Sequence, residues 1–75
     1  MSSEKVNGKR MVVMLGVNGE HLYRWPGDFW TYEEPPTNHD GSEPPFPWID
    51  NMTVLQMIKL KAVKKINNDT YKLVR

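Results

Sequence analysis

Residues 9–25 of this chain read KRMVVMLGVNGEHLYRW, with an Asn18-Gly19 dipeptide near their centre. This dipeptide is the strongest short signal for a β-hairpin, because both central positions of a type I′ turn require a positive φ. The apolar run over residues 9–16 has the length of a strand, and residues 20–25 would form the return strand. The stretch therefore predicts a hairpin over residues 9–25.

The turn also defines a register for this hairpin. Leu15 would lie opposite Leu22, and Val12 opposite Trp25, so that both faces are largely apolar. A hairpin with one solvated face alternates apolar and polar residues more cleanly. We therefore expect both faces to be covered, one of them by the segment that follows the hairpin.

That segment, residues 26–50, is acidic, aromatic and rich in proline. It contains all six prolines of the chain, six carboxylates and no Lys or Arg. Pro35-Pro36 and Pro44-Pro45 exclude helix and favour extended backbone. A loop of this length is unusual in a compact domain and tends to be functional when it is ordered.

Residues 53–66, TVLQMIKLKAVKKI, admit two interpretations. Thr53 and Gln56 have the spacing of a capping box, which favours a helix over residues 54–66. Against a helix, the apolar residues spread around the whole helical wheel, whereas residues 58–62 alternate as in a strand. We predict a strand, followed by a turn and a final strand at residues 70–75.

The predicted fold class is therefore all-β: a small antiparallel sheet of two hairpins joined by the long Pro-rich loop. It should curl into an SH3-like or partly open barrel, because a flat four-stranded sheet would leave one face bare. The alternative is an α+β fold with a helix at 54–66. Residues 1–8 are polar and predict a flexible tail, and residues 9–75 form a single small domain.

A chain of 75 residues has little apolar material for a core, and this one has no cysteine to form a disulfide. We therefore expect Trp25 and at least one of Trp30 and Trp48 to be buried. No apolar stretch resembles a signal peptide or is long enough to span a bilayer. The expected location is the cytoplasm, with no contact with a membrane.

Catalytic chemistry is not expected of this chain. His39, Asp40 and Glu43 could ligate a metal, but they lie on a polar loop tip rather than on a rigid frame. Glu33 and Glu34 are adjacent in an extended segment, so their side chains point to opposite sides. The sequence predicts no enzyme, no catalytic residue, no metal and no cofactor.

The acidic loop is the predicted binding surface. Aromatic side chains dominate binding hot spots, and carboxylates accelerate encounter with a basic partner. We expect a non-catalytic protein-interaction module, a modulator or inhibitor, that docks this loop onto a larger protein with a basic-rimmed apolar pocket. The predicted contact residues are Asp28, Phe29, Trp30, Tyr32, Glu33, Glu34, Phe46 and Trp48.

The basic C-terminal part supports an alternative function, a small β-barrel that binds nucleic acid. Its lysines, with nearby aromatic residues, would form a surface for a single strand. The pI of about 8.0 and the acidic block rank this interpretation second. The candidate nucleic-acid-binding residues are Lys59, Lys61, Lys64, Lys65 and Lys72. The sequence identifies neither the partner nor the oligomeric state.

Overall fold

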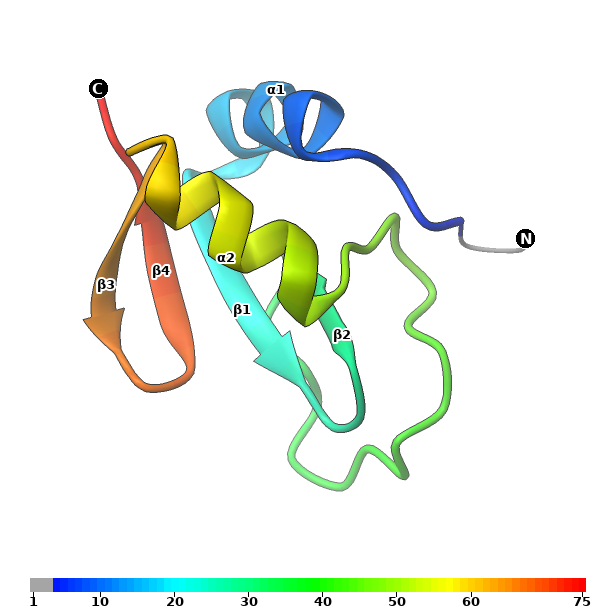
Figure 1. The fold of residues 1–75 in the computed structure, drawn as a ribbon. Coiled ribbons are helices and arrows are strands. Elements are labelled where there is room, and N and C mark those ends of the chain that lie inside the picture. The colour runs from blue at the N-terminus through cyan, green and yellow to red at the C-terminus, as the bar shows by residue number, and fades with distance from the viewer. Residues whose placement is uncertain (1–3) are drawn as a thin grey trace.

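The computed structural model describes residues 4–75 and shows an α+β fold, so the predicted all-β class is wrong. Four strands form one antiparallel sheet in the order β2-β1-β4-β3, and the sheet stays open instead of closing into an SH3-like barrel (Figure 1). The elements are α1 (Gly8–Asn18), β1 (His21–Trp25), β2 (Phe29–Thr31), α2 (Asn51–Lys59), β3 (Val63–Asn67) and β4 (Thr70–Leu73).

The first predicted strand, residues 9–16, is part of helix α1. The side chain of Asn7 caps the helix by accepting a hydrogen bond from the Arg10 amide at 2.8 Å. Met11 and Leu15, one helical turn apart, are both fully buried, whereas Val13 between them is 64% exposed. A strand would place all three on one face, so the burial pattern has the helical period.

The Asn18-Gly19 dipeptide ends α1 and does not form a hairpin turn. Gly19 has a φ of 124°, and its amide donates to the Leu15 carbonyl, as is usual where a helix ends at glycine. Both uses of the dipeptide exploit the same freedom of glycine to adopt a positive φ. The predicted pairing of Leu15 with Leu22 is therefore wrong, and β1 pairs with β2 and β4 instead.

The predicted strand over residues 53–66 is wrong in its first half, because helix α2 occupies Asn51–Lys59; its end lies in β3, which pairs with β4 as the second hairpin predicted. Asp50 caps this helix by accepting a hydrogen bond from the Thr53 amide at 2.9 Å. The chain leaves the helix through Lys61, which has a φ of 60°, and then enters β3. The α+β alternative named the correct class, but its helix at 54–66 starts late and extends into β3.

Both helices lie on the same face of the sheet (Figure 1). The core fills the space between them and that face, and it comprises Val6, Met11, Leu15, Leu22, Trp30, Ile49, Val54, Met57 and Val63. Trp25 is 2% exposed and Trp30 5% exposed, which confirms that Trp25 and one further tryptophan are buried.

The long loop covers part of the opposite face of the sheet, around Trp25. The ring of His39 meets the Trp25 indole edge-on at 4.7 Å, and the Phe46 ring lies 6.1 Å away. The Trp25 Nε1 group donates to the Glu33 carbonyl at 2.8 Å. The loop therefore forms a second, smaller core on the face that the helices leave bare.

The segment before α1 pairs with the end of the long loop. Backbone hydrogen bonds join the Val6 amide to the Trp48 carbonyl at 2.9 Å and the Trp48 amide to the Glu4 carbonyl at 3.1 Å. Val6 is buried in the core. These contacts involve part of the expected tail at 1–8, of which residues 1–3 lie outside the described residues.

Asp50 joins this N-terminal segment to α2. Its carboxylate accepts a hydrogen bond from the Lys5 ammonium at 2.8 Å in addition to those from Thr53. The bond from Lys5, followed by those from Thr53, holds the pKa of Asp50 well below its ordinary value of 3.8. Folding therefore favours the charged form of this carboxyl.

Replacing Asp50 with alanine is expected to lower the free energy of unfolding by about 1–2 kcal/mol at neutral pH, the usual cost of losing an N-cap. Because the pKa is lower in the folded state, the contribution is present above about pH 4 and lost as the pH falls further. Urea unfolding at several pH values measures both effects. Glu34→Ala, a change at an exposed carboxylate, is the control; equal acid sensitivity of Asp50→Ala and the parent would contradict the prediction.

Candidate functional site

The structure directs most of the predicted loop aromatics inward. Trp30 lies in the core, where its ring meets the Tyr71 ring edge-on at 5.3 Å. Phe46 is half-buried and packs against both Trp25 and Tyr32. These rings therefore already serve the packing of the protein.

Phe29 and Trp48 form a further internal pair. Their rings meet edge-on at 4.7 Å, and both side chains are half-buried. The Trp48 Nε1 group donates to the Glu43 carboxylate at 2.9 Å. Phe29 and Trp48 thus help to attach the end of the loop to the sheet.

The predicted carboxylates are the exposed part of the loop site. Asp28 accepts a hydrogen bond at 3.0 Å from the amide of Asn51, the first residue of α2, so it also supports the helix N-terminus. Glu33 and Glu34 are exposed. The structure does not gather the eight predicted contact residues into one exposed patch, and docking of the loop onto a partner stays a prediction.

The five lysines of the alternative site are divided between different parts of the surface. Lys64 and Lys72 are direct cross-strand partners on β3 and β4. Lys65 pairs with Tyr71, whose side chain lies on the helical face, so Lys65 belongs to that face. Lys59 and Lys61 lie at the C-terminal end of α2.

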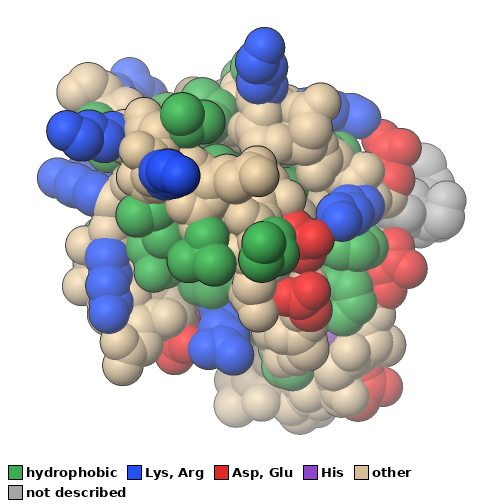
Figure 2. All heavy atoms as spheres, viewed as in Figure 1, with side chains coloured by type: hydrophobic (Ala, Val, Ile, Leu, Met, Phe, Trp, Pro, Cys, Tyr) green, Lys and Arg blue, Asp and Glu red, His purple; other side chains and the backbone are tan. Residues whose placement is uncertain are grey.

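The helices expose an apolar surface that was not predicted from the sequence. Seven large hydrophobic side chains are exposed among residues 4–75. Five belong to α1, to α2 or to the residue that ends α2: Val13, Val17, Met52, Leu55 and Leu60. Figure 2, viewed as in Figure 1, shows hydrophobic side chains at the surface along α2 and beside it. Contiguous apolar patches mark interaction sites on soluble proteins, and of these five residues Leu60 lines an apolar groove.

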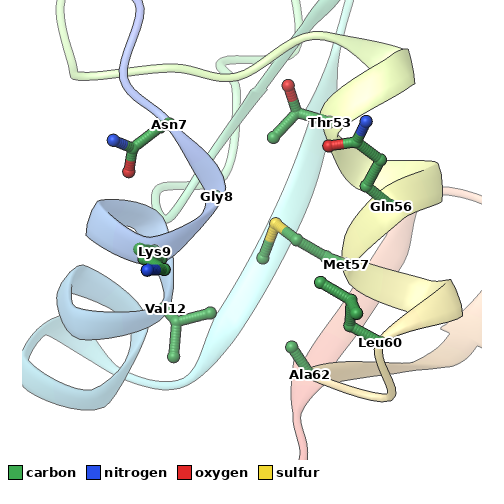
Figure 3. A pocket seen from close by; sticks show the side chains of 9 residues that line it. All are labelled: Asn7, Gly8, Lys9, Val12, Thr53, Gln56, Met57, Leu60 and Ala62. Atoms are coloured by element: carbon green, nitrogen blue, oxygen red, sulfur yellow. The ribbon is translucent and has the colours of Figure 1, made fainter.

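A groove separates α1 from α2. It has a volume of about 640 Å³, and its apolar lining includes Val12, Met57, Leu60 and Ala62. Figure 3 shows the Met57 side chain reaching from α2 toward α1. At Gly8 the helices come close, because a Cβ on this residue would lie 3.3 Å from the Met57 Cγ. The groove therefore results from the packing of α1 against α2.

Basic residues lie on and next to the two helices that form this groove. Residues 8–18 and 51–59 contain no Asp or Glu. Lys9 lines the groove, and Lys59 and Lys61 flank Leu60 in the chain. Within the described part of the chain, three carboxylates form ion pairs with cations other than these lysines: Glu4 with Arg10, Asp50 with Lys5, and Glu20 with Arg75.

A signal for this surface was present in the sequence. The apolar residues of 53–66 spread around a helical wheel, a pattern that argued against a helix. A helix that buries one apolar side in the core and exposes another gives the same pattern. Met57 and Leu55 of α2 illustrate the two sides, since the first is buried and the second is exposed.

The candidate metal ligands at the tip of the loop make contacts with neighbouring side chains and backbone. His39 packs on Trp25, and its Nε2 atom lies 2.8 Å from the Ser42 carbonyl oxygen. Hydrogen bonds from Ser42 lower the pKa of Asp40 below its ordinary value. Over residues 4–75, no group of three or more His, Asp or Glu side chains is arranged to hold a metal ion.

The sequence matches no known protein family, and neither a curated protein nor a solved structure shows significant similarity to it. Within the described residues, neither helix has the length and apolar character needed to cross a bilayer.

Proposed function

We propose that this chain is a non-catalytic protein-interaction module that binds an acidic amphipathic helix of a partner in the groove between α1 and α2. The observation that carries the proposal is the apolar groove with Leu60, 78% exposed, at its edge. Amphipathic helices commonly bind by laying an apolar stripe into such a groove. Burying Leu60 on binding contributes about 1.5–3 kcal/mol.

The charge around the groove selects the partner. Lys9, Lys59 and Lys61 have no acidic partner among residues 4–75, so carboxylates flanking an apolar stripe would complement them. A second copy of the chain would instead bring the same lysines to the interface, and like charges disfavour association. An acidic partner is therefore favoured over self-association through this face.

This proposal moves the contact surface from the 26–50 loop to the helices. The aromatics of the loop are used in packing, with Trp30 in the core and Phe46 against Trp25. Neither α1 nor α2 contains a carboxylate, and Asp50, the loop carboxylate that caps α2, is paired with Lys5. We place the module in the cytoplasm, the compartment expected from the cysteine-free composition.

Selection from a phage-displayed library of helix-forming peptides tests the proposal. The enriched peptides are expected to carry apolar residues at i, i+3 or i+4, and i+7, with Asp or Glu beside them. Leu60→Glu should weaken the binding of a selected peptide at least tenfold, as measured by fluorescence anisotropy. Because Leu60 is exposed, this variant should keep the melting temperature of the parent.

Ile66→Glu is the matched control, because Ile66 is an exposed apolar residue of β3 outside the groove. It should leave peptide binding unchanged. Enrichment of basic peptides, or equal loss of binding in the two variants, would show that the groove is not the contact surface.

A further inference from the structure

The sheet face opposite the helices is only half covered. The side chains of Leu22, Val63 and Tyr71 lie on the helical side of the sheet. Their neighbours along each strand therefore point to the opposite face. The long loop packs around Trp25 at the β1–β2 end. The remaining part, formed by the start of β1 with β4 and β3, is the open face of the sheet.

A row of basic side chains crosses the open face. Lys64 lies directly opposite Lys72, and Lys72 lies directly opposite His21 on β1. Like charges directly opposite one another destabilise a sheet. A bound polyanion would neutralise this row, so the repulsion in the free protein favours binding of an anionic ligand.

A shallow cavity of about 220 Å³ adjoins the two lysines. Within the described part of the chain, Glu20 is the carboxylate that lines it, and Glu20 forms an ion pair with Arg75. Lys64 and Lys72 have no ion pair in residues 4–75. Both ammonium groups are thus available to phosphates.

Aromatic rings lie beside the basic row. The rings of His21 and Tyr23 are stacked at 6.0 Å with 27° between their planes, and both residues are half-buried. Rings fixed next to lysines offer a stacking surface for bases along a phosphate backbone. An acidic protein surface would contact only the lysines. A single nucleic-acid strand would contact the lysines through its phosphates and the aromatic rings through its bases.

We infer that the open face binds single-stranded nucleic acid, with Lys64 and Lys72 contacting phosphates and Tyr23 stacking on a base. This site is independent of the proposed function, since the groove lies on the other side of the sheet. Two of the five candidate lysines thus form the site, together with a tyrosine ring that was not among the residues predicted from the sequence.

The test measures fluorescence anisotropy of a labelled oligothymidylate of about 15 nucleotides as the salt concentration rises. Lys64→Glu should weaken binding about tenfold and reduce the slope of log K against log salt by about 0.7, the value for one phosphate contact. This variant should remain folded, because the new carboxylate faces Lys72 and turns a repulsive cross-strand pair into an attractive one. Lys61→Glu, with the same change in net charge, should leave binding within about twofold of the parent.

Tyr23→Leu separates nucleic acid from other polyanions. It should weaken oligothymidylate binding several-fold and leave binding of heparin, which has no bases, unchanged. The inference is overturned if the parent does not bind at low salt, or if Lys64→Glu and Lys61→Glu weaken binding equally. It is also overturned if Tyr23→Leu binds oligothymidylate as tightly as the parent, which would indicate a site for polyanions in general.

Discussion

Replacing Trp25 with alanine is expected to lower the free energy of unfolding by roughly 3–5 kcal/mol, the usual range for a buried aromatic residue. The Trp25 side chain is 2% exposed and supports the packing of His39 and Phe46 from the long loop. Its loss also leaves the Glu33 carbonyl without the indole donor. Domains of this size have little stability to spare, so much of the protein should be unfolded.

Urea and thermal denaturation, followed by circular dichroism, measure this effect. Val17→Ala is a suitable control, because Val17 is exposed on α1 and its truncation should change the stability by no more than about 0.5 kcal/mol. Unchanged melting of Trp25→Ala would mean that the loop does not pack on the sheet. In that case, the loop would be a free arm, and the burial of Trp25 expected from the sequence would be contradicted.

Leu15→Ala is expected to cost about 2–5 kcal/mol, whereas Val13→Ala should cost less than about 0.5 kcal/mol. The difference follows from the helical geometry of α1, which buries Leu15 fully and leaves Val13 exposed. In the predicted strand the two residues would share a face and a similar environment. The pair of variants therefore distinguishes the helix from the strand by stability alone.

Far-UV circular dichroism of the parent and of both variants completes this experiment. Val13→Ala should keep or slightly increase the helical signal, since alanine has the higher helix propensity. Comparable destabilisation by both substitutions would contradict the helix over residues 8–18.

Prediction from the sequence was correct where a local signal has one structural meaning. Residues 20–25 and 70–75 were predicted as strands, and β1 and β4 lie within them. The prolines of residues 26–50 exclude long helices and strands, and this segment is a loop apart from β2. The burial of Trp25 followed from the shortage of other apolar residues in a chain of this length.

The errors arose where one signal serves two structures. Asn18-Gly19 can form a hairpin turn or end a helix, because both need a positive φ at glycine. The Val and Met residues before it have the composition of a strand, and the periodicity of Met11 and Leu15 is hidden among neighbours that are also apolar. Because residues 8–18 and 51–59 were predicted as strands or left ambiguous, the exposed apolar side of the helices was not predicted either.

The sequence by itself determined that residues 26–50 form a loop and where the chain changes direction. It also determined that tryptophan must supply part of the core. These features depend on backbone restrictions at proline and glycine and on the total apolar content. Only the tertiary structure decided that residues 8–18 and 51–59 are helices, since their caps at Asn7 and Asp50 are short-range but their stability comes from packing on one face of the sheet. It also decided which lysines share a surface, because strand pairing brings Lys64 and Lys72 together, whereas Lys59 ends α2, which packs on the opposite face, and Lys61 follows it.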